Sequence, residues 1–221
     1  MQSILADRSG MQWRKRRGNV LVLCVAAVLA LRLALAPTSA GDVYVVDGTR
    51  SEAKFEIRYL LSTVAGRLRD ISGVIDLDPS DPIASTVTFS MKTGSVDTGS
   101  VELDQLLRSA NFLDVARFPE ITFKSASIRN TAKTNVYQVI GDLSLHGVTK
   151  RIMLSVEVSG IVREGAGGAP TRATFMVRTS LNRKDYGINW NKILDHGALL
   201  VGEDFEVTIN LDASRQAPIR R

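Results

Sequence analysis

Apolar and polar residues alternate in short runs over most of this chain, and this period of two restricts the possible folds more than any other feature of the sequence. Phe55, Ile57 and Tyr59, for example, alternate with Lys54 and Glu56. Side chains of a β-strand point in turn to opposite faces, so each run predicts a strand with one apolar and one polar face. The clearest runs cover residues 54–59, 87–92, 152–158, 175–177 and 205–211.

Turn-forming residues separate the predicted strands, and no long helical pattern stands between them. Parallel strands would need crossover connections, which are usually helices, so the absence of helical patterns favours antiparallel hairpins. The sequence therefore predicts an all-β fold of about eight strands, either an antiparallel barrel or a sandwich. The predicted turns are Asp47-Gly48, 79–82, Asn130, His146-Gly147 and 165–168.

One segment breaks the alternation and has helical spacing instead. Leu103, Leu106 and Leu107 fall at i, i+3 and i+4 and form one apolar stripe, and a second short turn carries Phe112. Pro119 ends the helical spacing, because proline removes a backbone donor and disfavours helix in the residue before it. We therefore expect one or two short helices that cover one end of a barrel, or one edge of a sandwich, as a lid.

The first 40 residues have the layout of a secretory signal peptide. Four cations at 14–17 precede an apolar run at 20–31, and the small residues Thr38, Ser39 and Ala40 follow. We expect cleavage after Ala40, export to the periplasm or the exterior, and one mature domain of residues 41–221. The alternative is an uncleaved membrane anchor, although the run is shorter than the ~20 residues that a spanning helix needs.

The apparent basicity of the chain belongs to this N-terminal segment. The whole chain has 28 Lys and Arg against 23 Asp and Glu. Residues 1–40 hold six of the cations and one of the acids, so residues 41–221 are formally neutral. Nucleic-acid binding needs cations clustered on one face, and no such cluster remains in the sequence. The single cysteine, Cys24, also lies in this segment, so stability must come from the core rather than from disulfides.

Few residues could carry catalysis or bind a metal. A Ser-His-Asp triad needs a histidine oriented by an acid, whereas His146 and His196 each precede a glycine in what reads as a turn. Two distant histidines without a cysteine beside them do not make a zinc site. The sequence therefore predicts no catalytic residue, no metal and no cofactor. The polar run 182–187 is expected either to line an opening or to form a salt-bridged loop where a strand ends.

Four longer blocks of the sequence are LDQLLRSANFLDVARFPEITFKS (103–125), YQVIGDLSLHGVTKRIML (137–154), LNRKDYGI (181–188) and LVGEDFEVTINLDA (200–213). Taken in this order, they resemble the YceI-like family, and the resemblance extends from about Val43 to Ala213. It implies a lipocalin-like antiparallel β-barrel with short helices capping one end. It also implies a periplasmic protein of a family associated with polyisoprenoid binding.

The function expected from this resemblance is binding rather than catalysis. The residues alone leave open whether side chains fill the barrel or leave it hollow, and the resemblance implies a hollow one. We therefore expect an exported, non-enzymatic carrier of a long-chain isoprenoid, such as a polyprenol or an isoprenoid quinone, or of a similar apolar lipid. Membrane contact during ligand exchange and a homodimer are compatible with this role.

Two alternatives remain at this point. One is an enzyme that acts on a small apolar substrate at the barrel mouth, which requires His146 or Asp185 to lie in the cavity. The other is a solid barrel that only binds other proteins, which requires that no cavity exists. For the carrier hypothesis, the predicted cavity and lid residues are Phe55, Ile57, Leu68, Ile75, Val87, Phe89, Met91, Leu103, Leu106, Phe112, Phe123, Phe175, Val177 and Trp190.

Overall fold

A computed structural model describes residues 42–78, 81–163, 170–191 and 200–216 of the chain. The predicted signal peptide and the predicted turn at 165–168 lie outside the described residues, as does part of the predicted turn at 79–82. Nothing in the described ranges forms a helix long and apolar enough to cross a bilayer.

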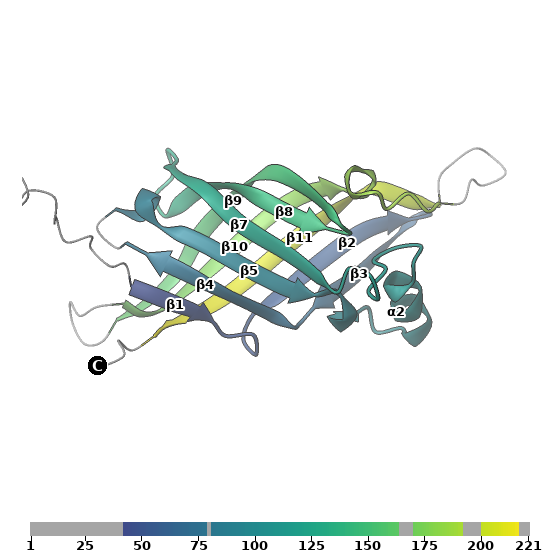
Figure 1. Cartoon of the computed structure of the whole chain (residues 1–221), viewed down its shortest axis with the longest axis horizontal. Helices are drawn as coiled ribbons and strands as arrows, with labels where there is room; N and C mark the ends of the chain where they lie inside the picture. Colours follow the sequence, from purple (N-terminus) through teal and green to yellow (C-terminus); the bar gives the residue numbers. More distant parts are fainter. Residues whose placement is uncertain (1–41, 79–80, 164–169, 192–199, 217–221) are drawn as a thin grey trace, which may run out of the picture. The chain divides into compact units, whose positions relative to one another are not determined.

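Eleven antiparallel strands account for most of the described residues (Figure 1). Four short helical elements lie between them: η1 (Pro82–Ala84), η2 (Thr93–Ser95), α2 (Val101–Arg108) and η3 (Arg183–Tyr186). The strands are β1 (Asp42–Val46), β2 (Glu52–Tyr59), β3 (Ser62–Leu68), β4 (Ile71–Leu77), β5 (Thr86–Lys92), β6 (Val96–Asp97), β7 (Glu120–Asn130), β8 (Val136–Leu145), β9 (Val148–Arg163), β10 (Pro170–Asn182) and β11 (Val201–Arg215).

These strands close into a barrel because β1 pairs with both β4 and β11. Three pairs of consecutive strands each run on as one bent strand: β1 with β2, β3 with β4, and β5 with β6. Thus β1 pairs with β4 while its continuation β2 pairs with β3, and both β1 and β2 lie beside β11. The eleven segments therefore form a closed antiparallel barrel of 8 strands, which confirms the all-β barrel predicted from the sequence.

The Asp47-Gly48 turn differs from the sequence prediction. It does not reverse the chain but bends it between β1 and β2, and the Thr49 N–H donates to Asp47 Oδ1 at 3.0 Å to hold the bend. A Cβ atom on Gly48 would lie 2.4 Å from the Ile71 carbonyl oxygen, so only glycine fits. The two-residue turn at His146-Gly147 does reverse the chain, with φ of 51° and 75°.

Helix α2 forms only the first part of the predicted lid segment. Ser100 caps it, since the Leu103 N–H donates to the Ser100 hydroxyl oxygen at 3.4 Å. The second helical turn expected around Phe112 is a series of tight turns instead. Asp114 has a φ of 45°, which interrupts any helix, and its carbonyl accepts the Phe118 N–H at 2.8 Å.

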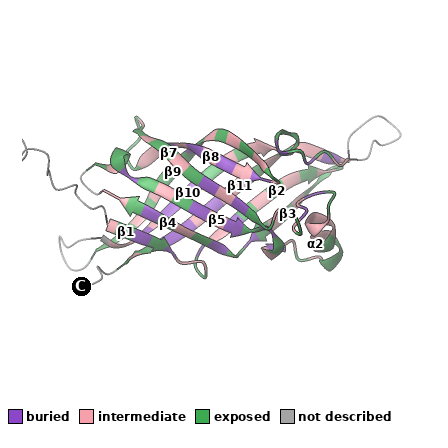
Figure 2. Cartoon of the chain, viewed as in Figure 1, coloured by how far each residue is buried: buried purple, intermediate pink, exposed green. Residues whose placement is uncertain are grey.

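The core of the barrel divides into a packed part and a hollow part. Phe89 and Phe123 stack with ring centroids 5.3 Å apart near the middle of the wall. Tyr44, Ile75 and Phe175 belong to the same buried core, and Figure 2 shows buried stretches of β1 and β4 at the end of the barrel away from α2. Toward α2, many inward side chains are only half-buried, because they face empty space rather than each other.

Candidate ligand-binding site

An apolar cavity occupies the α2 end of the barrel. Its walls come from the inner faces of β2, β3 and β5 and of β7 to β11, and α2 covers one side. The space free of atoms, counted to include the open mouth, is about 1360 Å³. The solid-barrel alternative required the absence of such a cavity, so the structure contradicts it.

The structure brings together most of the residues that the sequence analysis assigned to a cavity and lid. Their role in binding stays a prediction, because no ligand contact has been measured. Those that line the cavity are Phe55, Ile57, Leu68, Phe89, Met91, Leu103, Leu106, Phe112 and Trp190.

Five predicted residues lie elsewhere, in or against the packed core: Ile75, Val87, Phe123, Phe175 and Val177. They do point into the barrel, as the alternation predicted, but close neighbours fill the space in front of them. Phe123, for instance, is 2% exposed. Its ring lies so close to Gly141 that a Cβ atom added to this glycine would be 2.5 Å from the ring. The geometry therefore gives these five side chains a role in packing rather than in contact with a ligand.

The sequence analysis also missed part of the lining. Most of the missed residues lie on strands and come mainly from the second half of the barrel, where the site prediction included few positions. They are Ala53, Lys54, Tyr59, Val64, Val96, Leu107, Leu113, Ile121, Leu143, Leu145, Ile152, Leu154, Thr179, Leu181, Arg183, Ile188, Val201, Phe205, Val207 and Ile209.

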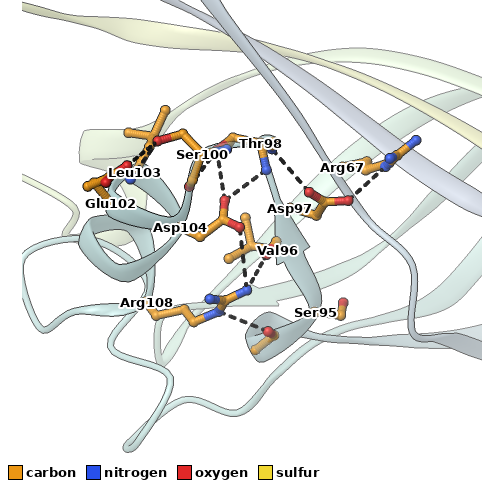
Figure 3. Close-up of polar contacts among 12 residues, drawn as sticks. Arg67, Ser95, Val96, Asp97, Thr98, Ser100, Glu102, Leu103, Asp104 and Arg108 are labelled. Carbon is orange, nitrogen blue, oxygen red and sulfur yellow. Dashed lines mark hydrogen bonds and ion pairs between the residues drawn. The ribbon is translucent and has the colours of Figure 1, made fainter.

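Helix α2 is tied to β6 by polar contacts at its outer side (Figure 3). Asp104 accepts from the Thr98 N–H at 2.8 Å and from the Thr98 hydroxyl at 2.7 Å. Arg108 donates through Nε to the Gly94 carbonyl at 3.0 Å and through Nη2 to the Val96 carbonyl. These bonds leave the apolar stripe of the helix turned toward the cavity. The helix is therefore a fixed part of the wall.

Aromatic packing extends this wall beyond the helix. The rings of Phe112 and Trp190 lie with centroids 5.2 Å apart and tilted by 50°. Both residues line the cavity, although they come from segments on opposite sides of the mouth. A ligand that enters there would contact the indole ring of Trp190.

Arg183 is the one buried charge in the described lining. Its side chain is 2% exposed and donates to the carbonyls of Gly202 and Ile188 at 2.7 Å, of Trp190 at 2.9 Å and of Val201 at 3.4 Å. Burial lowers the pKa of the guanidinium from its ordinary value, but an arginine remains protonated at physiological pH. Arg183 therefore links η3 to residues 188–190 and to the start of β11.

The other polar residues around η3 face outward and pair with each other. Lys184 bonds to Glu203, and this bond lowers the pKa of the Glu203 carboxyl. Lys150 lies 2.8 Å from Asp185, and Asn182 donates to Asp204 at 2.8 Å. Of the two expectations for the run 182–187, the salt-bridged loop describes these residues, whereas Arg183 and Tyr186 are buried.

The cavity offers little chemistry beyond apolar contact. Among the described lining residues, only Lys54, Tyr59, Thr179, Arg183 and Trp190 carry polar groups in their side chains, and none is a carboxylate. His146 and Asp185 both lie outside the lining, so the condition for the enzyme alternative is not met. His146 instead packs edge-on against Phe118 and bonds through Nδ1 to the Tyr186 carbonyl at 3.0 Å. Within the described ranges, no three His, Cys, Asp or Glu side chains gather as metal ligands would.

Comparison with known proteins agrees with this geometry. Residues 44–213 match the family model of the YceI-like domain. The chain belongs to the YceI-like family. Among sequence relatives, a UPF0312 protein of Azotobacter vinelandii is 37% identical over 166 residues, which cover 72% of this chain and 85% of the relative. A UPF0312 protein of Vibrio cholerae is 34% identical over 173 residues, 77% of this chain and 88% of the relative.

Solved structures show the same fold. BcnA of Burkholderia cenocepacia superposes with a TM-score of 0.66 at 19% identity, covering 76% of this chain and 99% of BcnA. A polyisoprenoid binding domain from Saccharophagus degradans superposes with a TM-score of 0.57 at 16% identity, covering 78% of this chain and 98% of that domain. At such low identity, the likeness establishes the barrel and leaves the ligand of this chain to be determined.

Proposed function

We propose that this protein binds a long-chain isoprenoid, such as a polyprenol or an isoprenoid quinone, inside its barrel and carries it outside the cytoplasm. The observation that carries the proposal is the cavity at the α2 end, with its large volume and almost wholly apolar lining. The family relationship supports the choice of ligand, since one structural neighbour is described as a polyisoprenoid binding domain. Export rests on the signal-peptide pattern of residues 1–40.

Apolar burial is sufficient to hold such a ligand. Each buried CH₂ group contributes about 0.8 kcal/mol, so one five-carbon prenyl unit contributes roughly 3–4 kcal/mol before costs. Ordering a flexible chain and losing its free motion oppose binding, but the free energy gained from several buried units exceeds those costs. This affinity needs no catalytic pair, so we propose binding without chemical change of the ligand.

A direct test uses the protein purified from its native host. We expect mass spectrometry of an organic extract to show an isoprenoid or a related lipid in stoichiometric amount. After delipidation, a long-chain prenol should bind saturably and change the fluorescence of Trp190, which is the only tryptophan once Trp13 has left with the signal peptide.

Substitutions on α2 separate cavity binding from binding to the outer surface. Leu106→Asp places a carboxylate in the apolar lining, where it is costly beside a hydrocarbon chain, and should weaken binding by roughly ten-fold or more. Gln105→Asp adds the same charge on the exposed side of the helix and should leave the affinity unchanged. Equal affinity of both variants, or no saturable binding of any lipid class by folded protein, would refute the proposal.

A further inference from the structure

Two adjacent leucines form the turn between β2 and β3. Tyr59 pairs with Ser62 across the hairpin, so Leu60 and Leu61 alone make the connection. The Leu61 side chain is fully exposed, and Leu60 is 44% exposed. Exposed single apolar residues are common on protein surfaces, but two neighbouring leucines at a hairpin tip present a projecting apolar edge.

The fold gains little from leucine at these two positions. Leu60 has a φ of 55°, a backbone conformation that glycine adopts readily and a leucine does not. Neither side chain is part of the buried core. Leucine is therefore unfavourable here for the backbone and for hydration, which suggests that the side chains act on something outside the molecule.

The turn lies at the rim of the cavity. Tyr59, just before the turn, and Val64, shortly after it, both line the cavity. The Leu60 N–H also donates to the carbonyl of Leu200 at 2.8 Å, and the next residue, Val201, lines the cavity as well. On α2, whose inner stripe also lines the cavity, Val101 is 69% exposed. Two separate elements thus present exposed apolar side chains at the cavity end of the barrel (Figure 1).

The charges next to the turn indicate what kind of surface it can meet. The outer wall there forms a hollow lined by four carboxylates, with Arg58 as its one cation among the described residues. An anionic surface would be repelled, whereas a bilayer of zwitterionic lipids would not. The carboxylates are those of Glu56, Glu203, Asp204 and Glu206.

The size of the apolar edge argues against a second copy of this chain as the occupant. A stable dimer buries at least about 1,200 Å² in total, far more than the few side chains at this rim can supply. Insertion into a lipid surface needs only a few apolar side chains, since each contributes independently.

We propose that the Leu60-Leu61 turn, together with Val101, inserts into a zwitterionic lipid bilayer and places the cavity mouth against it. The ligand then passes between the bilayer and the cavity without crossing water. Insertion depends only on the exposed residues at the rim, whereas the passage of ligand rests on the proposed function.

The test compares binding to phosphatidylcholine vesicles by flotation, using the protein from the host's soluble fraction with its N-terminus checked by intact mass. Leu60→Gly combined with Leu61→Ser should lower partitioning by roughly ten-fold or more, and should slow transfer of a prenol from vesicles to the protein. The control is Met153→Ser, which removes a side chain that is 57% exposed on the outer face of β9, and it should change neither measurement.

Folding does not confound this test, because glycine suits a positive φ and the melting temperature of the double variant should stay equal or rise. Equal partitioning of wild type and double variant overturns the proposal, as does binding that requires anionic lipid. A concentration-dependent dimer that the double variant loses also overturns it, because the turn would then meet a second copy.

Direct titration with the short prenol geranylgeraniol, without vesicles, keeps the two proposals apart. The double variant should bind it as wild type does, since both leucines lie outside the lining. If neither protein binds any prenol, the proposed function fails, whatever the vesicles show.

Discussion

At the scale of single residues, Arg183 shows how one side chain can organise the mouth of the cavity. Its guanidinium reaches carbonyls of two adjacent segments, those of Ile188 and Trp190 in one and those of Val201 and Gly202 in the other. A buried charge with only neutral partners is costly unless its hydrogen bonds are made, and the carbonyls supply them. The same charge lies within an otherwise apolar lining.

Replacing this side chain should therefore destabilise the barrel. Arg183→Met keeps much of the length but removes the donor to the carbonyls of Ile188, Trp190 and Gly202, and we expect a loss of roughly 2–5 kcal/mol in the free energy of unfolding. Lys184→Met removes a half-exposed ion pair with Glu203, which water already screens, and should cost much less. Urea denaturation measures both, and equal losses would contradict the clamp assigned to Arg183.

At the scale of elements, α2 and the turns that follow it act as one wall of the cavity. The polar side of the helix is bonded to β6, so the apolar stripe has little freedom to turn away. Phe112 continues this wall to Trp190. Release of a ligand should therefore depend on how tightly this wall packs.

Weakening the wall should speed ligand loss. Leu106→Ser combined with Phe112→Ser removes apolar contacts at the cavity, so dissociation of a bound prenol should accelerate while the far-ultraviolet circular dichroism stays β-like. Asn111→Ser, at an exposed neighbouring position, serves as the control. Unchanged exchange with a lower melting temperature would mean that the segment is only a structural plug.

At the scale of the whole molecule, the barrel divides stability and binding between its two ends. Ile75 lies in the packed part and is 4% exposed, whereas Ile57 is half-buried and faces the cavity. A side chain that already faces empty space has fewer neighbours to lose. The same substitution should therefore have different effects at the two ends.

Two isoleucines allow a matched comparison. Ile75→Ala should cost about 2–5 kcal/mol of unfolding free energy and leave prenol affinity unchanged. Ile57→Ala should cost less, about 1–2 kcal/mol, and should weaken prenol binding measurably. Denaturation and fluorescence titration on the same samples check this, and a reversed order of the two stability losses would refute the division of the barrel.

The N-terminal segment belongs to this scale as well. We predict that the protein found outside the cytoplasm begins at Gly41, because the small residues before it suit signal peptidase. Intact-mass measurement of secreted material checks the boundary. Recovery of the chain in the membrane fraction with residues 20–40 still attached would contradict it.

The alternation of apolar and polar residues by itself determined the fold class and the inward face of each strand, because neighbouring side chains of a strand always point to opposite sides. It also predicted the stripe of Leu103, Leu106 and Leu107, since helical spacing is equally local. No local rule indicated which inward positions meet a void, and for that reason Ile75 and Phe89 looked equivalent in the sequence.

Only the tertiary structure decided that difference, because the cavity depends on how strands distant in the chain come together. Tyr44 pairs with Arg215 to close the barrel, although 171 positions separate them in the sequence. Arg183 is the clearest case. The polar run around it was expected to line an opening or to form a salt-bridged loop, but segments folded over it supply the carbonyls that make burial of its charge possible.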